Sequence, residues 1–369
     1  MSKLVFTVFF ISISIASYGQ TVKERIKNSL SFTLDSRIDY VYQEMQIENS
    51  QDSQSQQFQF SDLLIQTSFS FTENLSLQFR YAPYPSDINS NGISDNIQYA
   101  NISYTNSKKN WKFTLGKFFL NIGTAEQYYD PNDVYIYSAV GNNLGVYKTG
   151  FTVEYDTKNG QSFGAQIVNS NRVDQDDIQK EMEYNFYYFG SLADGKIIPL
   201  ASFTTIPSTK IDPGYAMSVN LGVQWIFSKW HLDTDYAMAY NMPNFHQGLY
   251  YHSVPIRVLW NGDSFKPFVK YIYNHIESDS DFTTINIDSS AIQLSSEDYQ
   301  TIEVGLQYYP IEHKNIRLHL VGNYSIDKPS ILNSPSYPNP NSKSHLDSDL
   351  QIFLGLRIGL DFLKGLNTI

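Results

Sequence analysis

The sequence contains no cysteine and few charged residues, and each scarcity excludes a class of protein. Without cysteine the chain cannot be a disulfide scaffold, and it cannot carry a lipid on an N-terminal cysteine. Only 17% of its 369 residues are charged, and 37 acidic side chains against 26 basic ones give a net charge of −11. Nucleic-acid-binding proteins are usually basic, so we expect no nucleic-acid partner.

Long hydrophobic runs are also missing after the N-terminal segment. No window beyond residue 19 approaches the roughly 18 apolar residues that a membrane helix requires. Aromatic residues, in contrast, are abundant, with 28 Tyr, 24 Phe and 4 Trp, and the mean hydropathy is −0.33. This composition excludes a disordered chain. It is typical of a membrane β-barrel, in which only alternate residues face lipid.

The first residues have the features of a secretory signal. Lys3 supplies a positive start, residues 4–15 are apolar or hydroxylated, and Ser17 and Gly19 are small residues placed for signal cleavage. The apolar run is too short for a membrane anchor. The sequence therefore predicts a signal peptide over residues 1–19, cleaved after Gly19, and a single barrel domain over residues 20–369.

Alternation of apolar and polar residues is strongest near the C-terminus. It continues from residue 350 to residue 362, and shorter stretches occur at 32–42 and 316–320. A period of two over this length exceeds a usual soluble strand and indicates a membrane strand. The alternation directs Leu354 toward lipid and Gly355 toward the lumen. We therefore expect serine to be tolerated at position 355.

Short and long connections alternate along the chain. Turn-like clusters occur near residues 72–74, 107–110, 157–160, 193–196, 228–229, 261–263 and 312–315. Longer polar segments occur at about 43–57, 84–95, 121–146, 170–182, 206–213, 241–248, 277–298 and 327–347. Seven turns and eight loops predict an all-β, antiparallel up-and-down barrel of sixteen strands, with fourteen or eighteen left open. The turns would be periplasmic and the long loops extracellular.

The tryptophans give an independent indication of the membrane boundary. All four lie at the short-turn ends of expected strands, in register with apolar neighbours. Tryptophan is enriched at membrane interfaces, so these residues are predicted to form the periplasmic girdle. They are Trp111, Trp225, Trp230 and Trp260.

The opposite face of the expected strands is charged. Nine basic and eight acidic residues project inward, which predicts a water-filled lumen rather than a filled core. Arginines in this set would either brace the wall by pairing with carboxylates or guide anions, and we favour bracing. The charges that we single out as lumen-lining are Arg37, Arg80, Lys148, Glu154, Arg257, Lys270, Glu303, Arg317, Arg357 and Asp361.

One stretch resembles a known family. Residues 111–123, followed by Tyr128-Tyr129-Asp130-Pro131, Tyr137-Ser138 and Gly145-Val146, are similar to the third hairpin and third loop of bacterial porins. The similarity is greatest to the phosphate-selective O/P porins and related β-barrel porins of Bacteroidetes. This resemblance implies a sixteen-stranded diffusion channel, often trimeric, whose third loop folds into the lumen.

We therefore expect residues 121–146 to form the constriction of the pore. A surface loop of this length would be costly to order, whereas a loop inside the lumen can rest its aromatic side chains on the wall. An outward cap that contacts a partner or a neighbouring subunit is the alternative. The predicted constriction residues are Glu126, Tyr128, Tyr129, Asp130, Asp133, Tyr135 and Tyr137. Basic residues of the wall would face their acids across the gap.

The sequence predicts a porin for small hydrophilic solutes or ions in the outer membrane of a Gram-negative bacterium. Its expected partners are outer-membrane lipids, the solutes and two further copies in a homotrimer. Catalytic signatures, metal clusters and cofactor motifs are missing from the sequence, so we expect no enzyme, metal or cofactor. A barrel that serves as scaffold or accessory subunit of an assembly, secretion or adhesion complex is the alternative.

Overall fold

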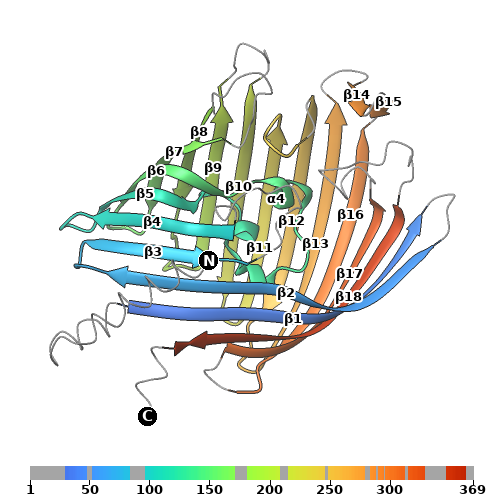
Figure 1. Cartoon of the computed structure of the whole chain (residues 1–369), viewed down its shortest axis with the longest axis horizontal. Helices are drawn as coiled ribbons and strands as arrows, with labels where there is room; N and C mark the ends of the chain where they lie inside the picture. The colour runs from blue at the N-terminus through green and yellow to red at the C-terminus, as the bar shows by residue number, and fades with distance from the viewer. Residues whose placement is uncertain are drawn as a thin grey trace, which may run out of the picture.

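The computed structural model describes residues 30–47, 52–83, 96–170, 181–207, 215–245, 248–278, 283–287, 290–294, 296–311, 315–328 and 346–362. Within these ranges, sixteen strands close into an antiparallel barrel (Figure 1). They are β1 Leu30–Ile47, β2 Ser53–Ser70, β3 Leu75–Tyr81, β4 Ile97–Thr105, β5 Trp111–Phe119, β6 Tyr147–Asp156, β7 Ser162–Asn169, β8 Met182–Phe189, β9 Ile197–Ile206, β10 Ala216–Phe227, β11 Trp230–Tyr240, β12 Leu249–Trp260, β13 Phe265–Ser278, β16 Glu297–Tyr308, β17 Asn315–Lys328 and β18 Leu346–Asp361. The predicted fold and strand number are confirmed.

The connections alternate in length as predicted except between β1 and β2, which residues 48–52 join. Six of the seven turn clusters lie between paired strands, and several contain a residue with positive φ, such as Ser228 at 57° and Gly160 at 74°. The seventh turn includes residues 312–314, which lie outside the described residues. Most or all residues of four predicted loops also lie outside them, namely 84–95, 170–182, 206–213 and 327–347. The segment predicted as a loop at 277–298 includes a separate hairpin of β14 Thr283–Ile287 and β15 Ser290–Leu294.

The loop predicted at 43–57 is wrong. β1 continues to Ile47 and β2 begins at Ser53, with Met45 opposite Ser53 in the register. Most described side chains of residues 54–58 are exposed and polar, so this part of the hairpin shows no apolar alternation. Backbone pairing in a ladder does not require apolar side chains, and the pattern therefore missed it.

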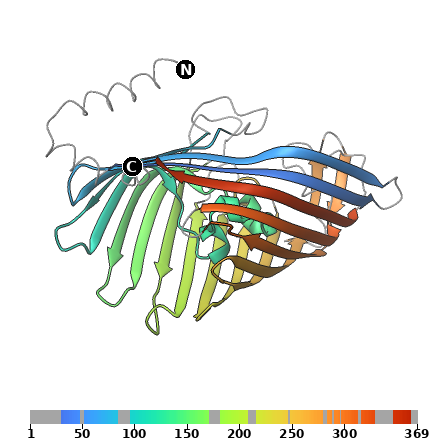
Figure 2. The same cartoon turned by 90° about the horizontal axis from the view of Figure 1, so that it is seen from below.

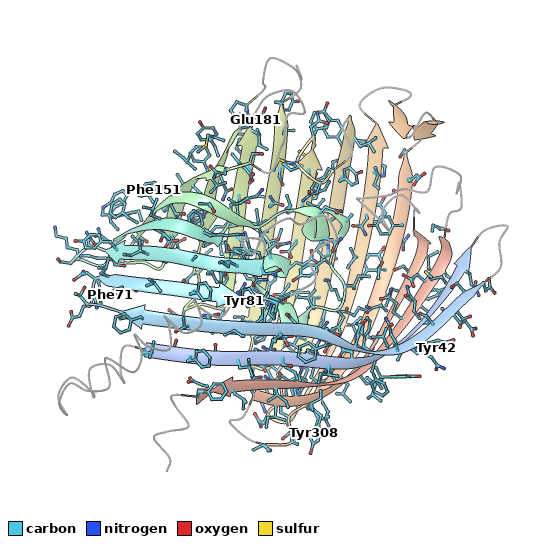
Figure 3. All side chains as sticks on the ribbon, viewed as in Figure 1. Tyr42, Phe71, Tyr81, Phe151, Glu181 and Tyr308 are labelled. Atoms are coloured by element: carbon cyan, nitrogen blue, oxygen red, sulfur yellow. The ribbon has the colours of Figure 1, made fainter. Side chains whose placement is uncertain are left out.

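The barrel wall has an apolar outer face. Outward residues such as Leu354, Val304 and Leu320 are more than half exposed, whereas the inward set is mostly polar and buried. Figure 3 marks the two ends of the wall, with Glu181 at the long-loop end and Tyr308 at the short-turn end. Among the described residues, no helix is long and apolar enough to span a membrane.

The barrel closes where its first strand meets its last. β1 pairs with β18, which also pairs with β17, and Arg37, Arg357 and Arg317 lie directly opposite one another across these three strands. Two residues along, the same register places Asp39, Gly355 and His319 in a row. His319 Nε2 lies 2.6 Å from the Asp39 carboxylate, so this contact passes over the glycine.

Position 355 will therefore not accept serine, contrary to the sequence-based expectation. A Cβ there would approach the Asp39 carboxylate and stand 2.5 Å from both His319 Nε2 and the backbone oxygen of Ile38. We predict that Gly355→Ser lowers the folded fraction in a heat-modifiability assay on gels. Gly322→Ser on β17 is the matched control, because nothing lies within 4 Å of its added Cβ. Equal folding of both variants would contradict the packing described here.

Candidate functional site

The connection between β5 and β6 lies inside the barrel rather than outside it. It contains the short helices η1 Ala125–Tyr128, η2 Pro131–Asp133 and α4 Ala139–Asn143. Figures 1 and 2 both show this green segment within the ring of strands. At its base, Leu120 N donates to Val146 O at 2.6 Å, so the segment leaves and rejoins the wall at one point. We call residues 121–146 the inner loop.

The inner loop first crosses β7, β8 and β9. Asn121 N donates to the Gln166 side chain at 2.8 Å, and Asn185 donates to Asn121 O at 3.0 Å. Gly123 N then donates to Ser202 Oγ at 2.9 Å. At this point the two backbones are so close that a Cβ on Gly123 would overlap residues 201 and 202. Only glycine permits this approach.

The η1 helix is held by two buried carboxylates. Asp235 on β11 accepts hydrogen bonds from Ala125 N at 2.8 Å and Glu126 N at 3.0 Å, which satisfies donors that a helix start leaves free. Glu126 is itself buried and forms an ion pair of 2.6 Å with Lys270 on β13. It also accepts from Ser138 N and Ser138 Oγ, so one carboxylate joins η1 to the start of α4.

The α4 helix begins against amide and hydroxyl groups of the wall. Ala139 N donates to Asn274 Oδ1 at 2.9 Å, and Val140 N donates to Ser253 Oγ at 3.1 Å. Ser138 caps the helix by accepting from Gly141 N. Asn274, Ser253 and Ser138 are all buried. The contacts of the α4 start with β12 and β13 are therefore made by uncharged side chains.

The η2 helix rests on the row of three arginines at the barrel closure. Arg37 donates to Asn132 O at 3.1 Å and to Val134 O at 3.0 Å. Arg357 binds Asp130 at 2.5 Å and Asp133 at 2.8 Å, and Arg317 also pairs with Asp133. Burial alone would raise the pKa of Asp133, but the Arg317 and Arg357 guanidinium groups outweigh it and lower that pKa below its ordinary value.

The tyrosines of the inner loop differ in their surroundings. The Tyr129 hydroxyl donates to Asp233 at 2.5 Å, and Arg257 lies 4.3 Å above its ring. Burial first, and Asp233 second, raise the Tyr129 pKa well above its usual value, so the phenol stays neutral. Tyr135 packs between Phe268, Phe353 and His319, with Arg37 at 4.7 Å. Tyr137 is half-buried, whereas Tyr128 is 42% exposed.

The predicted site residues fall into two groups. Inner-loop residues Glu126, Asp130 and Asp133 meet the predicted lumen residues Lys270, Arg357 and Arg317. The expectation that acids and bases face each other across an open gap is wrong on this side of the barrel. They are in direct contact. Glu126 and Lys270 are both buried, where a charge needs a partner, whereas Asp130 is 41% exposed and contacts the buried Arg357.

Arg37 and Arg257 contact the inner loop as described above, whereas the other predicted lumen charges lie within the wall. Lys148 lies 3.3 Å from Glu183, and Glu154 accepts from Tyr187 at 2.7 Å. Arg80 donates to the Tyr147 hydroxyl, Glu303 is buried opposite Lys270, and Asp361 lies opposite Thr33.

Sequence reasoning missed the uncharged anchors of the inner loop. Gln166, Asn185, Ser202, Ser253 and Asn274 all bind its backbone, yet none belongs to the predicted set. The only signal in the sequence was that these residues occupy lumen-facing positions of their strands. Many other hydroxyl and amide residues occupy such positions, so the signal could not distinguish the anchors from them. Among the described residues, no group of three or more histidines and carboxylates is placed to hold a metal ion.

The four tryptophans lie at the short-turn ends of β5, β10, β11 and β12. Trp111 and Trp230 are exposed on the outer face. Trp230 also contacts Trp260 at 4.9 Å, and Trp225 stacks on Phe227. This arrangement is compatible with a girdle at the membrane boundary.

Comparison with known proteins agrees with the geometry. Residues 32–204 match the family model of phosphate-selective porin O and P. This match covers slightly less than half of the chain, which therefore resembles porins of this family. No curated protein sequence matches it. The closer resemblance to Bacteroidetes porins stays a prediction.

Solved porin structures share the fold at low identity. The anion-selective porin from Comamonas acidovorans superposes with a TM-score of 0.58 at 11% identity, covering 90% of this chain and 99% of the other. Salmonella typhi OmpF, in complex with daunomycin, gives 0.57 at 15% identity, covering 89% and 97%. The trimer form of Vibrio cholerae OmpT gives 0.52 at 12% identity, covering 90% and 100%. The porin family match and the barrel support an outer-membrane passive diffusion channel.

Proposed function

We propose that this porin is a passive channel for small hydrophilic solutes or ions, in which the inner loop narrows the lumen. The observation that carries the proposal is the anchoring of that loop to inward side chains of β1, β9, β11, β13, β17 and β18. Contacts on so many strands hold the loop across the lumen. The opening that remains would then set the solute size limit.

The proposal extends to how the protein is exported and assembled. A signal peptide over residues 1–19 would direct export, and residues 20–369 would form one barrel in contact with outer-membrane lipids. A homotrimer is favoured by the trimer form of a structural neighbour. Transport would need no catalytic residue, because diffusion through a pore forms and breaks no bonds.

The channel should favour cations weakly, and only at low salt. The inner-loop acids hold the arginines of the closure row, while the segment 277–298 carries six acidic residues and neither lysine nor arginine. Acidic mouths concentrate cations over a Debye length, which shrinks to about 3 Å at 1 M salt.

Reversal potentials in planar bilayers will test the channel. We expect open steps with a cation preference at low salt that fades near 1 M. Strong anion selectivity that persists at 1 M would contradict the charge assignment. Absence of steps from folded, reconstituted protein would contradict the pore itself and favour a scaffold.

A further inference from the structure

The wall from β3 to β8 differs in chemistry from the arginine row on β1, β18 and β17. A cavity of about 230 Å³ lies against β3 to β8, and most of its lining side chains are uncharged amides, hydroxyls or aromatic rings. Its polar lining includes Gln78, Asn101, Thr114, Asn121, Thr152 and Gln166. Amides both donate and accept hydrogen bonds, and hydroxyls do the same. A lining of this kind matches a solute that carries many hydroxyl groups.

Aromatic rings form a continuous path beside this cavity. Phe119, which lines it, lies 5.8 Å from Tyr128 on the inner loop, and Tyr128 lies 5.1 Å from Phe189. Phe189 in turn lies 5.0 Å from Tyr187, which lines the cavity again. Tyr128 remains 42% exposed at the centre of the path. The electron-rich face of an aromatic ring attracts the slightly positive C–H face of a sugar ring.

The charges near the cavity are already engaged with protein groups. Lys112 and Glu154 are its two charged lining residues, 3.7 Å apart, and Glu154 also accepts from Tyr187. The nearby Arg80 guanidinium lies 4.3 Å above the Tyr99 ring and donates to Tyr147. An anion would have to compete with these contacts.

The amides of Gln166 and Asn101 are also bound to backbone oxygens of the protein, those of Phe119 and Lys117. Gln78, in contrast, is exposed, and the hydroxyls of Ser103 and Thr114 bind each other within the lining.

We propose that this wall is a weak binding site for neutral polyhydroxylated solutes, namely mono- or disaccharides, which stack on Tyr128 while the exposed Gln78 amide and the hydroxyls of the lining bind their hydroxyl groups. The inference rests on the proposed pore and specifies its solute class. A pore that passes solutes benefits from weak binding, since a solute must be able both to enter and to leave.

Sugar titration of the reconstituted full-length protein in planar bilayers will test this site. Maltose should reduce the ion current along a saturable curve, because a bound sugar occupies the passage. A polyethylene glycol of equal hydrodynamic size should give only a non-saturating decrease, since it lacks the array of hydroxyls. Inorganic phosphate should have no saturable effect. Saturation by phosphate but not by maltose would overturn the proposal and indicate an anion site.

Variants at Tyr128 separate stacking from simple obstruction. Tyr128→Ala should raise the half-saturating maltose concentration roughly three- to tenfold, the range expected for loss of one aromatic contact. Tyr128→Phe is the matched control and should remain near the wild-type value, because it keeps the ring. Gln78→Ala, at an exposed position of the lining, should weaken binding with little effect on the fold.

The outcomes distinguish this inference from the pore on which it rests. Stable channels without saturable inhibition by maltose would overturn the sugar site and leave the porin function intact. Equal half-saturation in Tyr128→Ala and wild type would also overturn it. Folded protein that forms no channels would overturn the proposed pore instead.

Discussion

Replacing residues 127–137 with a short Gly-Ser bridge should enlarge the single-channel conductance and make the pore selective for anions. The deletion removes Asp130 and Asp133, which bind Arg317 and Arg357. Both arginines are buried beneath η2 together with Arg37, so its loss would expose the guanidinium groups of the row to the lumen. Arg37 keeps its pair with Asp39 and Arg357 its pair with Asp35, whereas Arg317 loses its partner Asp133. Conductance, solute size cutoff and reversal potential in bilayers should all change, while heat-modifiable folding persists.

A second variant separates the size effect from the charge effect. Adding Arg317→Gln and Arg357→Gln to the deletion should preserve the larger conductance and abolish the anion preference. If the deletion leaves conductance and size cutoff at wild-type values in a folded barrel, the inner loop is not the constriction. If the anion preference survives both glutamines, its source lies elsewhere in the lumen.

Lys270→Met should release the inner loop from the wall. Lys270 and Glu126 are both buried and lie 2.6 Å apart, and Lys270 also donates to Ile136 O at 2.7 Å. Removing one partner of a buried pair leaves a carboxylate without compensation and costs about 3–5 kcal/mol. We expect faster hydrogen exchange of residues 124–138, with the strands still protected.

The matched control is Lys229→Met. Lys229 in the β10–β11 turn forms a pair with Asp263 in the β12–β13 turn at 3.2 Å. Both side chains are exposed, and such pairs contribute only about 0–1 kcal/mol. Adding Glu126→Gln to Lys270→Met should restore much of the loop protection by removing the unpaired charge. Equal exchange in the two lysine variants would mean that the buried pair does not hold the loop.

The strand number was predictable because a lipid-facing wall imposes alternation and short turns require particular residues. Both signals are local in sequence, so Leu354 and the cluster at 228–229 identify a strand face and a turn without knowledge of the fold. The hairpin at 43–57 escaped prediction because polar side chains cover it. The alternation of apolar and polar residues that marks a lipid-facing strand is missing there, although the backbones of the two strands are paired.

The contacts of the inner loop could not be predicted in the same way. They join residues far apart in the sequence, 45 positions between Asn121 and Gln166 and 110 between Ala125 and Asp235. Acidic and basic residues could be recognised as lumen-facing from the sequence. The ion-pair partner of each one could not be predicted, because it depends on the register of the barrel strands. Gly355 shows the same limit: its restriction comes from a contact between its two neighbouring strands.

The arginine row also depends on completion of the barrel. Arg37 belongs to the first strand, whereas Arg317 and Arg357 belong to the last two, and Arg37 joins the other two only when β1 pairs with β18. A barrel still open at this seam would lack the hydrogen bonds from Arg37 to Asn132 O and Val134 O that complete the docking of η2. Ring closure thus completes the set of contacts that holds η2, and the same three side chains connect the two ends of the sheet through η2.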